Sequence, residues 1–240
     1  MRQGKDLIIF PLDVAEAEQA RRLVSLLHEH VGMFKVGLEL FIRTGPGLLQ
    51  WIGEHAAAGI FLDLKLHDIP ATVHRAMQAV ADLNVALATV HCGESRAMLA
   101  AAAQGAQGKV GVLGVTVLTS VGATDLHDAG YAVNSEADLQ QLVLRKAQMA
   151  HEAGLRGIVC SGQEAAAVKA RFGKPFLAVT PGVRPSWDTH GKDDQRRIVT
   201  PAAAVAAGSD FLVIGRPIRD AADPVDAAKR IADEIEAALL

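Results

Sequence analysis

Short apolar runs rich in β-branched residues recur along the chain, and each is typical of a buried strand in a parallel sheet. There are eight such runs: LIIFPLD (7–13), MFKVGL (33–38), GIFLDLKL (59–66), ALATVHC (86–92), KVGVLGVTVL (109–118), GIVCSG (157–162), FLAVTPGV (176–183) and DFLVIGRPI (210–218). The segments between them are rich in alanine and carry apolar residues at helical spacing, as in residues 20–31 and 225–235. The pattern predicts strands and helices in alternation along the whole chain.

This alternation predicts parallel strands, because each helix carries the chain back to the start of the next strand. Eight such units in 240 residues fit a (β/α)8 TIM barrel, an α/β fold, better than an open doubly wound sheet. The sequence also lacks the Gly-rich turn of a dinucleotide-binding sheet. We therefore expect a single (β/α)8 catalytic domain that spans residues 1–240.

Two connections are longer and more polar than the others, residues 119–139 after the fifth predicted strand and residues 184–199 after the seventh. TIM barrels carry their ligand-binding loops at the carboxyl ends of the strands. Both segments are therefore candidate binding loops, although ordinary surface loops have a similar composition.

The composition limits the classes of partner. With 24 Lys and Arg against 27 Asp and Glu, the formal net charge is −3, and no basic stretch predicts nucleic-acid binding. No segment reaches the roughly 18 apolar residues of a membrane helix, and the first apolar run is too short for a signal peptide. Cys92 and Cys160 lie in apolar runs and are expected to be buried, reduced thiols. We expect a cytoplasmic protein.

One predicted strand brings charge into an apolar context, in the stretch IFLDLKLHDIP at residues 60–70. Side chains alternate between the two faces of a strand, so Ile60 and the leucines share one face. Asp63, Lys65 and His67 share the other. In a TIM barrel the apolar face packs on helices, and the charged face points toward the barrel axis at the active-site end.

An isolated buried carboxylate is unfavourable, so cations are expected beside it. Asp63 and Lys65 offset each other, and Asp68 extends the pattern to Asp-x-Lys-x-x-Asp if cations separate the carboxylates. The second predicted strand points Lys35 to the same side, and the first ends at Asp13. Two other interpretations remain: a structural ion-pair network that braces the barrel, and Asp13 as the N-cap of the first helix.

Lys65 is expected to be a proton donor. Flanking carboxylates favour the charged form of a lysine, which suits a general acid acting on a carbanion. A Schiff-base lysine needs the opposite environment, because it must lose its proton near neutral pH. A divalent metal held by Asp63, Asp68 and either His67 or His91 is the alternative, but an ammonium between the carboxylates would repel it. We therefore predict no metal, and we expect both histidines to be structural.

The last two predicted strands end in glycine and arginine, with Gly182 and Arg184 in TPGVRP, and Gly215 and Arg216 in IGRP. Glycine allows close approach to the backbone, and free N–H groups beside a guanidinium complement a phosphate dianion. TIM barrels often bind phosphate at this place. The pattern is only moderately specific, because Gly-Arg pairs also occur in plain turns.

These stretches together resemble the orotidine 5'-phosphate decarboxylase family over nearly the whole chain. The resemblance is carried by seven motifs: PLD (11–13), KVGLEL (35–40), DLKLHDIPATV (63–73), VTVLTS (115–120), TPGVR (180–184), DDQRR (193–197) and IGRPI (214–218). DLKLHDIP is highly specific to that family. None of the motif positions departs from the family pattern.

The resemblance implies decarboxylation of orotidine 5'-monophosphate (OMP) to uridine 5'-monophosphate (UMP) and CO2, the last step of de novo UMP synthesis. No metal or organic cofactor would take part. By family likeness Lys65 would protonate the ring carbanion within an array that includes Asp63 and Asp68. Asp13 and Lys35 would hold the ribose hydroxyls.

The same resemblance implies the remaining substrate contacts and a homodimer. Thr119 and Ser120 would lie by the pyrimidine. The phosphate would be held by residues at the ends of the last two strands and in the loop between them, namely Arg184, Gln195, Gly215 and Arg216, with the loop around Gln195 closing as a lid. Asp68 and Thr72 would reach into the neighbouring subunit's active site, so the two sites would be shared.

Two other functions are compatible with parts of the pattern. Sugar-phosphate decarboxylases and hexulose-phosphate synthases resemble the chain around Asp-x-Lys-x-x-Asp but use a magnesium-bound enediolate. Those enzymes carry an acidic metal ligand near the end of the second strand, where this sequence has Lys35. The other candidate is a catalytically inactive phosphate-ligand sensor on the same barrel, against which the intact Lys65 argues.

Overall fold

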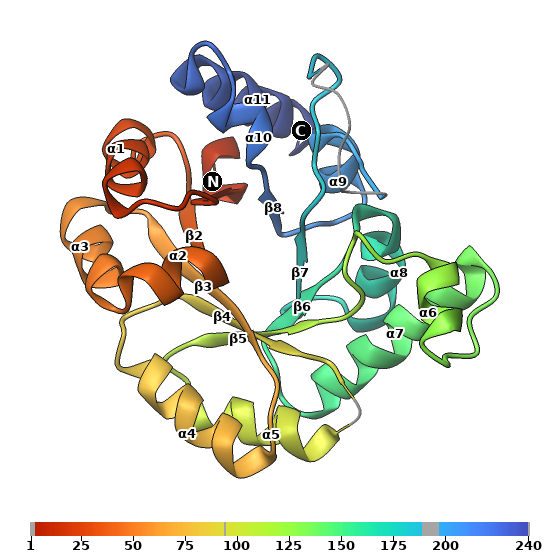
Figure 1. Ribbon diagram of the computed structural model, residues 1–240. Coiled ribbons are helices and arrows are strands. Elements are labelled where there is room, and N and C mark those ends of the chain that lie inside the picture. Colours follow the sequence, from red (N-terminus) through yellow and green to blue (C-terminus); the bar gives the residue numbers. More distant parts are fainter. Residues whose placement is uncertain (1–2, 94, 189–196, 240) are drawn as a thin grey trace.

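The computed structural model describes residues 3–93, 95–188 and 197–239. Eight parallel strands close into a barrel in sequence order (Figure 1). They are β1 (Ile8–Pro11), β2 (Met33–Gly37), β3 (Gly59–Leu66), β4 (Leu87–His91), β5 (Gly111–Val115), β6 (Gly157–Val159), β7 (Leu177–Thr180) and β8 (Phe211–Val213). Each strand lies within one of the predicted apolar runs, and the (β/α)8 TIM barrel is confirmed.

Helices surround the ring of strands (Figure 1). They are α1 (Ala17–Leu27), α2 (Leu38–Thr44), α3 (Gly47–His55), α4 (Pro70–Ala81), α5 (Arg96–Gly105), α6 (Ala123–Asp128), α7 (Glu136–Glu152), α8 (Gly162–Phe172), α9 (Pro201–Ala206), α10 (Arg216–Arg219) and α11 (Pro224–Leu239). A short 3-10 turn, η1 (Gly4–Leu7), precedes β1. The helical spacing predicted the buried face of α1, where Ala20, Val24 and Leu27 pack inward.

Two layers of apolar side chains hold the barrel together. The outer layer lies between strands and helices, and the inner layer fills the barrel axis with Ile9, Phe61, Leu87, Leu113, Val179, Phe211 and Val213. Because successive strand residues alternate in direction, β1 sends Ile8 and Phe10 to the outer layer and Ile9 to the axis. The axis is therefore a packed core rather than a pore.

The two cysteines are buried and free, as predicted. Burial raises the pKa of the Cys92 thiol to about 12, so the thiol stays protonated at neutral pH. Burial likewise raises the pKa of Cys160. Both side chains therefore act as small apolar groups in the core.

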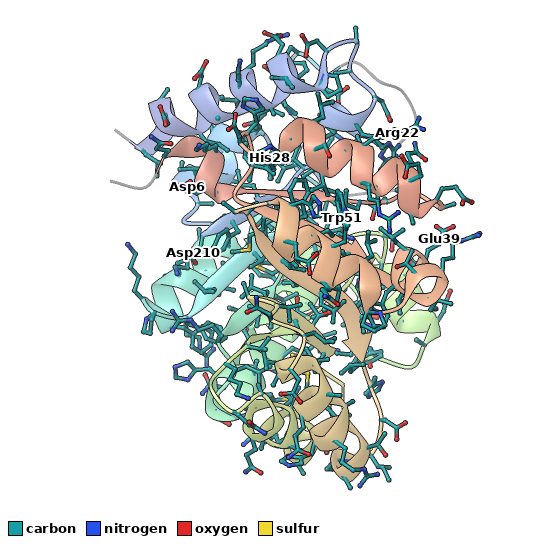
Figure 2. The ribbon with its side chains drawn as sticks, turned by 90° about the vertical axis from the view of Figure 1, so that its left-hand side faces the viewer. Asp6, Arg22, His28, Glu39, Trp51 and Asp210 are labelled. Carbon is teal, nitrogen blue, oxygen red and sulfur yellow. The ribbon has the colours of Figure 1, made fainter. Side chains whose placement is uncertain are left out.

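The outer face of the helix layer carries charged side chains. Figure 2 shows Arg22 of α1 and Glu39 of α2 at this surface, with Trp51 of α3 between α1 and α3. The Trp51 ring packs against the outer core. The guanidinium carbon of Arg21 lies 5.5 Å from the centroid of this ring, in a cation–π contact. No helix within the described ranges combines the length and the apolar character needed to cross a membrane.

Candidate active site

The carboxyl ends of the strands surround a cavity of about 380 Å³. This is the end of a TIM barrel at which active sites are built. The cavity lining includes ten of the site residues that the sequence singled out: Asp13, Lys35, Asp63, Lys65, Thr119, Ser120, Gly182, Arg184, Gly215 and Arg216. The fold thus brings the charged strand and the arginine-bearing strand ends into one cavity.

Four of these residues form a chain of alternating charge. Lys35 Nζ on β2 lies 3.1 Å from Asp13 Oδ1 and 3.6 Å from Asp63 Oδ2. Lys65 Nζ on β3 donates to the same Asp63 oxygen at 2.8 Å. The ammonium and carboxylate groups therefore interleave as the sequence suggested. The N-cap of α1 is Glu16, so the interpretation of Asp13 as a helix cap is wrong.

The buried Asp63 carboxylate is held in its charged form by its neighbours. Burial alone would raise the pKa of Asp63, but the charges of Lys35 and Lys65 oppose this effect. Hydrogen bonds from Lys65 and from the hydroxyl of Thr89 act in the same direction. The net result is a pKa below the ordinary value, so Asp63 is an anion between two ammonium groups.

The backbone at Lys65 is unusual. Its φ is 52°, in the left-handed region that residues with a side chain rarely adopt. Between Leu62 and Leu66 the register with β4 shifts, because Leu62 pairs with Ala88 and Leu66 pairs with Val90. Extra β3 residues are thus accommodated opposite a shorter stretch of β4, as in a bulge. The bulge lies at the residue whose ammonium enters the cavity.

Asp68 and Thr72 are not among the residues that line the cavity of their own chain. Asp68 lies in the turn after β3, and Thr72 lies in the first turn of α4. The Asp68 side chain is exposed, and its Oδ1 accepts the backbone N–H of Ile69 at 2.6 Å. The Lys65 ammonium pairs with Asp63, and the chain begins α4 at Pro70, two residues after Asp68. A role for both residues in a neighbouring subunit stays a prediction.

A second part of the cavity lining, after β7 and β8, has glycines and arginines. A Cβ added to Gly215 would lie 2.8 Å from Pro11 Cγ, so the close approach of the segment after β8 to β1 favours glycine. Gly182 has a φ of 73°, a conformation that favours glycine. Arg184 lines the cavity, and its Nη1 donates to the carbonyl of the preceding residue at 2.9 Å. Arg216 begins α10 directly after Gly215.

A buried ion pair that the sequence did not predict joins Arg197 to Glu164 of α8. The two residues are 5% and 3% exposed, respectively. Arg197 Nη2 also donates to the backbone carbonyls of Val117 and Leu118, at 3.2 Å in each case. These carbonyls precede Thr119, so the pair anchors the loop that carries Thr119 into the cavity. Residues 189–196, which include the predicted phosphate ligand Gln195, lie outside the described residues.

Arg219 is a further cavity residue that sequence reasoning missed. Its Nη1 donates to the backbone carbonyl of Asp13 at 3.0 Å, and its Nε and Nη2 reach the two carboxylate oxygens of Asp220 at 2.6 and 3.0 Å. The hydrogen bond with Asp220 raises the pKa of the guanidinium. Its position three residues after Arg216, on one helical turn, was the signal that could have identified it.

The two histidines near the array have structural surroundings. Their rings, in His67 and His91, lie 6.1 Å apart. Burial lowers the pKa of His91, and His67 and Lys65 lower it further, which favours the neutral ring. A Cβ added to Gly93 would lie 2.6 Å from His67 Nε2, so this ring packs closely on the backbone. Across the described ranges, no three His, Cys, Asp or Glu side chains are placed to hold a metal ion.

A family model described as "Orotidine 5'-phosphate decarboxylase / HUMPS family" matches residues 6–231. The chain is 53% identical to an orotidine 5'-phosphate decarboxylase of Desulfosudis oleivorans, over 99% of this chain and 96% of that protein. It is 48% identical to the protein of the same name in Halorhodospira halophila, over 98% of each chain.

Solved structures show the same similarity. The crystal structure of orotidine 5'-phosphate decarboxylase from Lactobacillus acidophilus has a TM-score of 0.82 and 33% sequence identity, and the match covers 95% of this chain and 98% of that chain. An uncharacterized conserved protein from Geobacillus kaustophilus has a TM-score of 0.80 and 34% identity, over 95% of this chain and 99% of that chain.

Proposed function

Because the chain belongs to the orotidine 5'-phosphate decarboxylase / HUMPS family, we propose that it decarboxylates OMP to UMP and CO2 with Lys65 as the proton donor. This reaction is the last step of de novo UMP synthesis. The high identity to relatives that are named orotidine 5'-phosphate decarboxylase supports this activity within the family. The enzyme acts without a metal or an organic cofactor, and its place is the cytoplasm.

The observation that carries the proposal is the contact of Lys65 Nζ with Asp63 Oδ2 at 2.8 Å inside the cavity. Loss of CO2 leaves an electron pair on ring carbon 6 that the pyrimidine cannot delocalise. A fixed ammonium at this position stabilises the developing negative charge and then transfers its proton to the carbon. Asp63 keeps the ammonium in place, and its charge opposes the carboxylate of the bound substrate, which favours the departure of CO2.

The remaining cavity residues divide between the two ends of the substrate. Asp13 and Lys35, which contact each other at 3.1 Å, bind the ribose hydroxyls. Thr119, on the loop anchored by Arg197, lies by the pyrimidine. The phosphate binds after β7 and β8, between Arg184 and Arg216, where Gly215 leaves the backbone accessible. Gln195 adds a further phosphate contact. Binding energy gained at the phosphate orders the site around the reacting carbon.

The active form is a homodimer in which Asp68 and Thr72 complete the site of the neighbouring subunit. Asp68 is exposed and is not among the residues that line the cavity of its own chain, which leaves its carboxylate available to a partner. Ile69 beside it is 65% exposed, and Leu38 and Ile42 of α2 are 49% and 78% exposed. A partner that covers these side chains would remove their apolar surface from water.

An ultraviolet absorbance assay with OMP tests the activity. We expect full turnover in excess chelator, whereas a magnesium-dependent enzyme such as a hexulose-phosphate synthase would lose activity. Lys65→Ala should bind UMP nearly as well as wild type but lose roughly 10³-fold or more in turnover, because both charge stabilisation and proton transfer are removed. Lys109→Ala is the matched control, because Lys109 is an exposed lysine paired with Asp82 at 3.6 Å. Near-wild-type turnover of Lys65→Ala would refute its role.

A further inference from the structure

Thr89 of β4 is a buried threonine whose hydroxyl touches two groups of the charged array. The residue is 1% exposed. Its Oγ1 donates to Asp63 Oδ1 at 2.9 Å and accepts the backbone N–H of Lys65 at 2.9 Å. A single hydroxyl therefore uses its proton on the carboxylate and a lone pair on the backbone of the proposed proton donor.

The contact with Asp63 assigns a separate task to each carboxylate oxygen. Oδ1 accepts the Thr89 hydroxyl, whereas Oδ2 faces the ammonium groups of Lys35 at 3.6 Å and Lys65 at 2.8 Å. A carboxylate held at one oxygen cannot rotate about its Cβ–Cγ bond without breaking that hydrogen bond. Thr89 therefore keeps Oδ2 directed at the two lysines.

The contact with Lys65 supports the bulge in β3. A residue at a φ of 52° is strained, and strain of this kind persists only where the surroundings fix the conformation. Thr89 lies between Ala88 and Val90, the two β4 residues that pair with β3 on either side of the register shift. Its hydroxyl supplies the acceptor for the Lys65 N–H, which would otherwise be a backbone donor without a partner in a partly buried site.

We propose that Thr89 is a positioning residue of the decarboxylase, whose hydroxyl fixes the Asp63 carboxylate and the Lys65 backbone so that the Lys65 ammonium stands at the reacting carbon. The inference rests on the proposed roles of Lys65 and Asp63. A threonine needed only to fill a buried strand position would not require its hydroxyl, because valine packs equally well on such a strand.

The test compares Thr89→Val, which removes the hydroxyl at nearly constant shape, with Thr89→Ser, which keeps the hydroxyl and removes the methyl group. Thr116→Val is the matched control, because Thr116 is also buried, at 3% exposure, and donates one hydrogen bond, to the carbonyl of Val159 at 2.9 Å. For each protein, kcat and KM for OMP are measured across the pH range, together with the affinity for UMP and the thermal midpoint.

We expect kcat of Thr89→Val to fall by roughly 10- to 100-fold, the scale of a displacement of about 1 Å at a reacting group, while KM and UMP affinity change little. The acid limb of its pH profile should move to higher pH, because the Thr89 hydrogen bond lowers the pKa of Asp63. Thr89→Ser should recover most of kcat. Thr116→Val should keep both the wild-type kcat and the wild-type pH profile.

A folded Thr89→Val protein with wild-type kcat and pH profile would overturn the inference, as would a Thr89→Ser protein as impaired as the valine variant. If Thr89→Val does not fold, Thr89→Ser is compared with Thr89→Cys, since a thiol is a weak donor and acceptor of similar shape. Equal kcat values for these two proteins would then overturn it. Lack of OMP turnover by the wild-type protein would instead count against the proposed function.

Discussion

Replacing Glu164 with glutamine tests how strongly the buried pair with Arg197 stabilises the barrel. Glutamine keeps the shape of the side chain but removes the negative charge that faces the guanidinium. Glu164 is 3% exposed and Arg197 is 5% exposed, so water cannot replace the lost partner. Removing one member of such a pair costs about 3–5 kcal/mol, because the remaining charge is buried without compensation. Glutamine still accepts a hydrogen bond, so we expect a loss in the lower half of this range.

Two measurements give this loss directly. Equilibrium unfolding in urea, followed by circular dichroism, should show a lower midpoint concentration at an unchanged slope. For a chain of this size about 1 kcal/mol corresponds to about 2–4 °C, so the thermal midpoint should fall by roughly 6–16 °C. Glu18→Gln is the control, because Glu18 lies 3.5 Å from Arg22 and their side chains are 64% and 78% exposed. We expect the control to change stability by less than about 0.5 kcal/mol.

A loss of less than about 1 kcal/mol in Glu164→Gln would refute this account of the buried pair. A double variant, Glu164→Leu with Arg197→Met, separates stability from function. Apolar residues of similar volume restore stability at buried pairs, but the double variant lacks the donor to the Val117 and Leu118 carbonyls. We therefore expect a recovered midpoint with a raised KM for OMP, and a wild-type KM would show that Arg197 does not position the loop.

Three further predictions concern the site itself. Arg216→Ala should weaken UMP binding by roughly 10- to 100-fold, through loss of a charge-assisted hydrogen bond, and leave uridine binding nearly unchanged; equal losses in calorimetry would contradict the phosphate role. Mixing inactive Lys65→Ala with inactive Asp68→Ala should restore part of the activity in the absorbance assay, because one site of the mixed dimer receives both intact residues. No recovery despite proven subunit exchange would count against shared sites. The pKa of Asp63 is lowered in the folded state, so its charge stabilises the fold above the unfolded pKa of about 4, and this stabilisation is lost as the pH falls further. The difference in free energy of unfolding between wild type and Asp63→Asn, measured in urea, should therefore shrink on acidification. A pH-independent difference would contradict this.

The strand pattern was sufficient to predict the barrel and the inward direction of Asp63 and Lys65. Alternation along a strand is a local property that the sequence shows directly. The charged residues also lie at the carboxyl end of β3, which is the end of a TIM barrel at which active sites are built. The same regularity says nothing of Asp68. A bulge interrupts the alternation at Lys65, where the backbone is left-handed. A lysine gives no sign of such a backbone in the sequence, because residues with a side chain rarely adopt it.

The partners of the site could not be predicted, because they come from distant parts of the chain. Thr89 was one polar residue in an apolar run, and its value depends on the register between β3 and β4. Arg197 was one residue of a short basic run in the sequence, and the fold buries it against Glu164, 33 residues earlier in the chain. Pairings at such separations are decided by packing rather than by local sequence.

The charged residues of the cavity come from two adjacent arcs of the ring, which meet where β8 pairs with β1. Asp13, Lys35, Asp63 and Lys65 follow or belong to β1, β2 and β3, whereas the arginine wall follows β7 and β8. The residues proposed to act on the ring carbon and those proposed to bind the phosphate therefore share no strand. Substitutions confined to the first arc can alter the bond that is broken while the second arc continues to select phosphorylated molecules, so the same scaffold can acquire a new reaction without first losing its hold on its ligands.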